Sequence, residues 1–168
     1  MTSKRTAWVE LRNRKLPIAQ SVAAGMVGGF VMGLLMQYST GTMTTIAGLV
    51  GMDSLAAAWA VHLMISVVFG VVFGLMLTFT SAGRFLVSTL AMGLLGMTYG
   101  IVLWFLAAGF AMPAWLSAMN MVTDPAIPSL DVTGLTIHVL YGLVMAGTYM
   151  LVYTMNREEE SSKLIGDV

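Results

Sequence analysis

The sequence predicts an all-α membrane protein in which four transmembrane helices form a bundle of two repeated helix pairs. Hydrophobic residues make up 58% of the 168 residues, and charged residues make up only 10%. A soluble domain has about 25% charged residues, so much of this protein must meet lipid. Four apolar stretches are near or above the ~20 residues that a helix needs to cross the hydrocarbon. They are residues 18–38, 55–79, 85–110 and 134–155.

Polar segments flank the predicted transmembrane domain, residues 18–155. In residues 1–17, apolar Trp8 and Leu11 are mixed with five Lys and Arg residues. This mixture predicts either a basic amphipathic segment on the anionic inner membrane surface or a disordered basic tail. Residues 156–168 form a polar cytoplasmic tail with three consecutive glutamates, which we expect to fray in solvent.

The placement of charge predicts the orientation in the membrane. All eight Lys and Arg residues lie before the first span, between the second and third spans, or after the fourth. The charged residues of the other two connections are all acidic, namely Asp53, Asp124 and Asp131. The positive-inside rule then places both termini in the cytoplasm of a prokaryotic-type cell, with the protein integral to its plasma membrane. A formal net charge of zero gives no reason to expect nucleic acid as a partner.

The two acidic connections are long for a helical bundle. Residues 39–54 are rich in Thr and Gly, whereas residues 111–133 contain Pro113 where a short helix would begin. Short polar side chains near the starts of the second and fourth spans are typical helix caps. The candidate caps are Asp53 or Ser54 for the second span and Asp131 or Thr133 for the fourth. We favour capping over cation binding for these acids.

Small residues recur every four positions within the spans. The first span carries Gly25, Gly29 and Gly33, and the third carries Gly96 and Gly100. The second and fourth spans continue the pattern with His62, Ser66, Gly70, Gly74 and with His138, Gly142, Ala146. This spacing keeps the small residues on one helix face, where they typically let two helix backbones approach. The pattern predicts a duplicated helix pair, residues 18–80 and 85–155, related by an axis along the membrane normal.

The two histidines of the chain, His62 and His138, lie near the outer ends of their spans. Polar rings at membrane depth are functional candidates. Two neutral imidazoles at matched depth, with small Ser66, Gly70 and Gly142 below them, predict a haem b site with two axial nitrogens. We therefore expect the second and fourth spans to face each other. The alternative is that both histidines only hydrogen-bond across helices, and the absence of Lys or Arg near the expected propionates favours it.

Methionine suggests a second metal. The chain has 16 methionines and no cysteine, and thioether sulfur together with imidazole suits Cu(I). Methionine is also a flexible filler of apolar space, so copper is the less favoured cofactor. The candidate methionines on the outer side are Met43, Met52, Met112, Met119 and Met121.

These patterns favour a non-catalytic role. No Asp, Glu, Lys or Arg lies within a predicted span, so a charge-coupled transporter would lack its usual parts. No Ser–His–acid set is evident for catalysis by this chain alone. We expect a subunit of a larger respiratory or redox complex, in contact with other membrane subunits or with copies of itself. The alternatives are a homo-oligomeric channel or carrier for a small neutral solute, and a structural scaffold without a cofactor.

The predicted orientation is testable because the natural chain lacks cysteine. Cysteines introduced at Thr45 and Ala126 should react with a membrane-impermeant thiol reagent added to intact cells. A cysteine at Ser81 should react only after the cells are opened, because the positive-inside rule places it in the cytoplasm. Labelling of the Ser81 variant in intact cells would reverse the predicted orientation.

Overall fold

The computed structural model describes residues 18–166, with residues 87 and 159–166 described by their backbone alone. The basic segment predicted for residues 1–17 lies outside this part. The described residues form helices and no strands. Four helices are long and apolar enough to cross a membrane, Ile18–Thr40, Leu55–Phe79, Thr89–Ala118 and Val132–Glu158. The predicted all-α, four-helix membrane protein is thereby confirmed.

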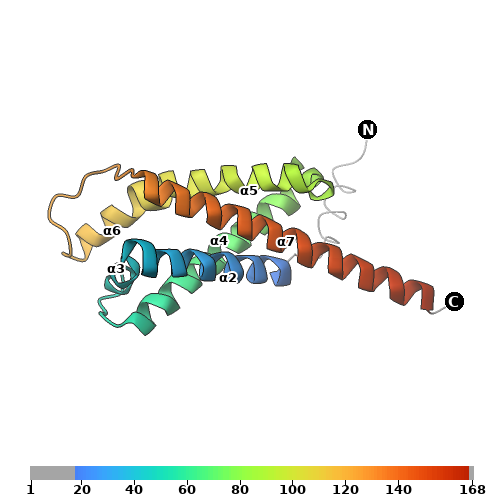
Figure 1. Cartoon of the computed structure of the whole chain (residues 1–168), viewed down its shortest axis with the longest axis horizontal. Helices are drawn as coiled ribbons and strands as arrows, with labels where there is room; N and C mark the ends of the chain where they lie inside the picture. Colours follow the sequence, from blue (N-terminus) through green and yellow to red (C-terminus); the bar gives the residue numbers. More distant parts are fainter. Residues whose placement is uncertain (1–17, 167–168) are drawn as a thin grey trace, which may run out of the picture.

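The long helices run side by side, and two short helices lie together at one end of the bundle (Figure 1). We call this end, with α3 and α6, the loop end, and the opposite end, with Arg84 and Arg157, the basic end. The elements in chain order are α2 (Ile18–Leu35), the π-helical η1 (Met36–Thr40), α3 (Met43–Gly48), α4 (Leu55–Phe79), the 3₁₀ segment η2 (Ser81–Val87), α5 (Thr89–Leu103), the π-helical η3 (Trp104–Ala111), α6 (Met112–Ala118) and α7 (Val132–Gly166).

Caps explain where the helices begin. The Ser54 hydroxyl accepts a hydrogen bond from the Ala57 backbone N–H at 3.2 Å, so α4 starts where the sequence predicted the second span. Ser88 caps α5 in the same way through Ala91 at 3.3 Å. The third span therefore begins at residue 89 rather than 85, after the 3₁₀ segment. The Asp131 carboxylate accepts from the Gly134 N–H at 2.6 Å, which confirms it as a cap of α7.

The C-terminal helix is longer than the predicted fourth span. We expected the polar tail from residue 156 to fray, but α7 continues as far as Gly166. No Gly or Pro interrupts the chain between Gly147 and Gly166, so the backbone has no local reason to leave the helix. Figure 1 shows α7 extending beyond the rest of the bundle at the basic end.

Glycine brings the helices of each pair to backbone distance. A Cβ atom on Gly70 of α4 would lie 2.7 Å from the Cα atom of Gly25 in α2. A Cβ atom on Gly142 of α7 would likewise lie 3.0 Å from the backbone nitrogen of Gly100 in α5. Neither crossing has room for a side chain, which is the typical use of small residues between membrane helices. The matching contacts of the α2–α4 and α5–α7 pairs are consistent with duplication, which itself stays a prediction.

The two pairs join through α2 and α7, so α4 and α7 do not pack along each other. The expectation that these two spans face each other directly is wrong, because α2 packs closely against both. Aromatic side chains of α7 bridge the remaining distance. The Tyr141 hydroxyl donates to the Ser66 carbonyl at 3.0 Å, and the Tyr149 ring lies edge-on to Phe73 with centroids 5.9 Å apart.

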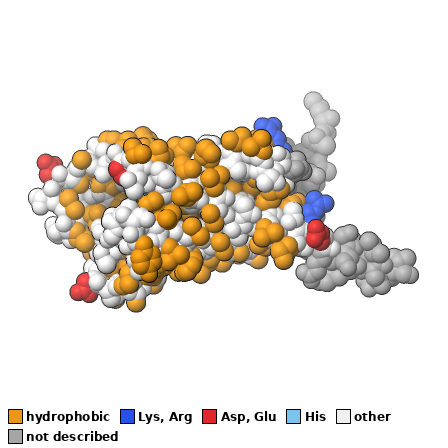
Figure 2. Space-filling model, viewed as in Figure 1, with side chains coloured by type: hydrophobic (Ala, Val, Ile, Leu, Met, Phe, Trp, Pro, Cys, Tyr) orange, Lys and Arg blue, Asp and Glu red, His pale blue; other side chains and the backbone are white. Residues whose placement is uncertain are grey.

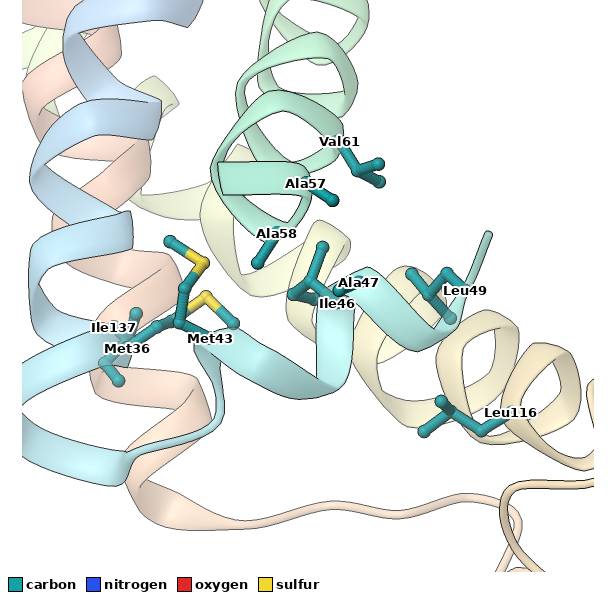
Figure 3. Close-up of a cluster of buried hydrophobic side chains, with 10 residues drawn as sticks. All are labelled: Met36, Met43, Ile46, Ala47, Leu49, Ala57, Ala58, Val61, Leu116 and Ile137. Carbon is teal, nitrogen blue, oxygen red and sulfur yellow. The ribbon is translucent and has the colours of Figure 1, made fainter. Parts of the chain in front are cut away.

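The short helix α3 folds back onto the start of α4 and covers the loop end (Figure 3). The sequence indicated a Thr- and Gly-rich connection here, and the helix within it was not predicted. Ile46 and Leu49, three residues apart, are both buried and belong to the same apolar cluster as Ala58 of α4. The other members of this cluster are Met36, Met43, Ala47, Ala57, Val61, Leu116 and Ile137.

The outer surface of the bundle is apolar along its length. Hydrophobic side chains cover the flank in Figure 2, and the charged side chains lie at the two ends. Phe30, Met64 and Leu94 of three different helices are each more than half exposed. Such a belt is unfavourable in water and favourable in hydrocarbon, so the flanks contact the lipid bilayer.

The glycine contacts predict that the same Gly→Ala substitution changes stability differently at three positions. Gly70→Ala and Gly142→Ala should each destabilise the fold by about 1–3 kcal/mol, because the added methyl group overpacks a backbone crossing. Gly147→Ala is the control, since nothing lies within 4 Å of a Cβ atom there. Unfolding of the purified variants in detergent measures the difference. Equal stability of all three variants would mean that the helices do not cross at these glycines.

Candidate functional site

Both histidines line a single cavity of about 200 Å³ in the loop-end half of the bundle. The cavity lies between the two helix pairs, with α2, α3 and α4 on one side and α5, η3, α6 and α7 on the other. Its wall is mainly aliphatic, aromatic and thioether side chains. The polar side chains on the wall are those of His62, Ser66, Trp115, His138 and Tyr141. We call this space the histidine cavity.

His62 is held by α2, the neighbouring helix of its own pair. Its Nε2 atom donates to the Gly29 carbonyl at 2.9 Å, and the side chain is only 5% exposed. The bond crosses to α2 because residue 29 has no side chain to separate the helices there. Trp59 packs edge-on to the imidazole, with centroids 6.3 Å apart, and donates to Gln37 at 2.8 Å.

His138 is held by its own helix. Its Nδ1 atom donates to the Gly134 carbonyl at 2.8 Å, one turn earlier in α7. Gly134 in turn donates its backbone N–H to the capping carboxylate of Asp131. The first turn of α7, capped by Asp131, therefore fixes the orientation of this ring through the Gly134 carbonyl.

The structure brings together His62, His138 and Ser66, but it places Gly70 and Gly142 outside the cavity. The stripe of small residues on α4 faces α2, and the stripe on α7 faces α5. Gly70 and Gly142 are therefore covered by the backbones of these neighbouring helices. The members of each stripe nearest the loop end line the cavity between the pairs. They are His62 and Ser66 on α4 and His138 on α7.

Several residues of the cavity wall were not predicted. Tyr141 follows His138 by three positions, and this helical spacing alone could have placed both on one face. The π-helical segments contribute Met36 from η1 and Ala107 and Ala108 from η3. Single π-helical turns are frequent at functional sites, but composition does not reveal where a helix widens.

Most of the methionines predicted for copper do not line the histidine cavity. Met112 is the one member of the predicted set that lines the histidine cavity, whereas Met43 is buried in the cluster around α3. Two methionines outside that set, Met32 and Met36, also line the cavity. Within the described residues, no group of three or more His, Cys, Asp or Glu side chains is placed to hold a metal ion.

A second cavity of about 270 Å³ adjoins the histidine cavity at the loop end. The two share Met32, Met36, Ala108, Met112 and His138 as a common boundary. The second cavity is more polar, with Thr40, Thr42, Ser129 and Asp131 on its wall. We call it the vestibule, since it leads from the loop end toward the apolar interior.

Aromatic side chains pack on the basic-end side of the histidine cavity. The Tyr99 hydroxyl of α5 donates to the Phe69 carbonyl of α4 at 2.8 Å. Phe73 is fully buried beneath it and contacts the rings of Tyr99 and Tyr149. We call Tyr99, Tyr141 and Phe73 the tyrosine floor, and the two adjoining cavities together the chamber.

The cavity volume does not favour the predicted haem, which stays a prediction. An apolar cavity of about 150 Å³ holds one benzene molecule, so a cavity of about 200 Å³ is much too small for a tetrapyrrole plate. The glycines predicted to make room beside the plate, Gly70 and Gly142, are filled by helix backbones. The volume and the glycine contacts both favour a smaller occupant.

Comparisons of the chain with protein-family models, with curated proteins and with solved structures find no match.

The tyrosine floor gives a stability prediction. Tyr141→Phe keeps the ring but removes the hydrogen bond to the Ser66 carbonyl, so it should cost about 0.6 kcal/mol, the average for hydrogen bonds between membrane helices. Tyr38→Phe is the matched control because Tyr38 is 77% exposed. Unfolding in detergent compares the two variants, and a Tyr141→Phe variant as stable as the control would show that the bond contributes nothing to the fold.

Proposed function

We propose that this membrane protein binds a small, neutral, largely apolar molecule in the histidine cavity, as a carrier or receptor for that molecule. The observation that carries the proposal is the shared cavity itself, since two imidazoles from different helix pairs line one apolar space. Ligand sites in proteins are typically apolar spaces with a few convergent polar groups. The arrangement of the histidine cavity matches this description.

The size of the cavity supports a ligand with a single six-membered ring. At about 200 Å³, the space exceeds the ~150 Å³ that accommodates benzene in an engineered cavity. The difference leaves room for one or two substituents. Larger fused rings would need the walls to move.

The access route supports uptake from the loop end. A ligand would pass the threonines of the vestibule, cross the boundary of Met32, Met36 and Met112, and reach the histidines. Methionine suits such a boundary because its side chain is unbranched and flexible. The tyrosine floor, with fully buried Phe73 in contact with Tyr99, lies on the basic-end side of the cavity, which favours a carrier or receptor over an open channel.

The other predicted roles receive less support. Copper(I) stays a second prediction for the same cavity, resting on the thioethers of Met32, Met36 and Met112 beside His138. Membership of a redox complex and self-association also stay predictions. The exposed apolar flanks are accounted for by lipid.

A cysteine in the cavity wall tests the proposal. Ala108 borders both cavities, and the chain has no other cysteine. In the Ala108→Cys protein, phenol at saturating concentration should slow the reaction with a small methanethiosulfonate reagent several-fold. The four-ring 1-hydroxypyrene should not protect, because it exceeds the cavity.

A cysteine at Ser81, in η2 at the basic end, is the control and should react at the same rate with and without phenol. Equal protection of both cysteines, or no protection of either, would contradict binding in the histidine cavity. The purified wild-type protein should also lack a haem Soret band.

A further inference from the structure

The hydrogen bonds of the two histidines determine which ring nitrogen carries the proton. A carbonyl oxygen can only accept, so the nitrogen that faces it must donate. His62 therefore carries its proton on Nε2, facing Gly29, and His138 carries its proton on Nδ1, facing Gly134. In a neutral imidazole the other nitrogen then has a lone pair and can only accept. These acceptors are Nδ1 of His62 and Nε2 of His138.

Both acceptor nitrogens belong to imidazoles that line the cavity. Neither makes a hydrogen bond to any residue that the structure describes. At the same time, no side-chain nitrogen or oxygen among these residues is both fully enclosed and without a partner. The free nitrogen of His62 must therefore border a space large enough for a solvent molecule. The side chain is 95% buried and lines the histidine cavity, so that space is the cavity.

The rest of the wall adds few donors. The Tyr141 hydroxyl already donates to the Ser66 carbonyl, which leaves its oxygen as a further acceptor. The Ser66 hydroxyl can donate or accept, and the Trp115 indole N–H donates only. Acceptors thus predominate deep in the cavity, on both helix pairs.

We infer that the ligand is a hydrogen-bond donor, a neutral ring-sized molecule with two hydroxyl groups, of the dihydroxybenzene or quinol class. This inference rests on the proposed function and specifies its substrate class. One hydroxyl donates to His62 and the other to His138, so the ligand spans the two helix pairs. A hydroxyl oxygen can also accept from Ser66.

The same geometry disfavours the acceptor forms of such a ring. A quinone or a diether presents only oxygen lone pairs, which would face the lone pairs of the two imidazoles. A site built for a ligand hydroxyl rejects the analogue that lacks it, because its own polar groups are then left unpaired. The cavity should therefore select the reduced, hydroxyl form of a quinol over the oxidised form.

Three para-disubstituted benzenes of similar shape test the inference. They are 1,4-dimethoxybenzene, 4-methoxyphenol and hydroquinone, with zero, one and two donors. Calorimetric titration of the wild-type protein in detergent, under argon, should give an affinity that rises about two- to tenfold with each hydroxyl. The Ala107→Phe variant, with the cavity filled, provides the reference for partition of each compound into the micelle.

Substitution of one histidine refines the test. In His138→Phe the ring shape remains but one acceptor is gone, so hydroquinone and 4-methoxyphenol should bind with equal affinity. If the wild-type protein binds all three compounds equally, or the diether most tightly, the donor inference is overturned while cavity binding stands. If no compound binds wild type more than Ala107→Phe, the proposed function itself fails.

Discussion

The close approach of helix backbones at glycine determines the rest of this structure. Gly25 against Gly70, and Gly100 against Gly142, bring two pairs of helices nearer than side chains would allow. Because each pair is so tight, the space between the pairs must be filled by larger groups. Aromatic rings fill it at the basic end, and at the loop end it stays open. The histidine cavity is therefore a consequence of where the small residues are placed.

Most of the fold could be predicted from the sequence, because hydrophobic length, charge placement and glycine spacing are local signals. The limits of α4 matched the prediction at both ends, and Ser54 supplies the reason at its start. The buried side of α3 was missed because its pattern is only six residues long. The order of helices around the bundle was missed as well, since glycine stripes predict that helices touch and not which of their faces remain free.

The site was partly predictable for a similar reason. His62 and His138 were identified as candidates because polar rings are rare at membrane depth, and both line the cavity. The sequence could not distinguish a stripe that borders a ligand from one that borders a helix, so Gly70 and Gly142 were assigned to a cofactor. Ala107 and Ala108 carry no chemical signal at all. They line the wall from within the π-helical η3, whose position the sequence does not reveal.

The pairing of helices also has a consequence for how the protein is made. Each tight pair consists of spans that follow one another in the chain, α2 with α4 and α5 with α7. Contacts between sequence neighbours form early and quickly, so each hairpin can assemble soon after its second span enters the membrane. The contact between α2 and α7 joins the first span to the last. The chamber therefore comes into existence only at the final step of biogenesis, after the whole membrane domain has been synthesised.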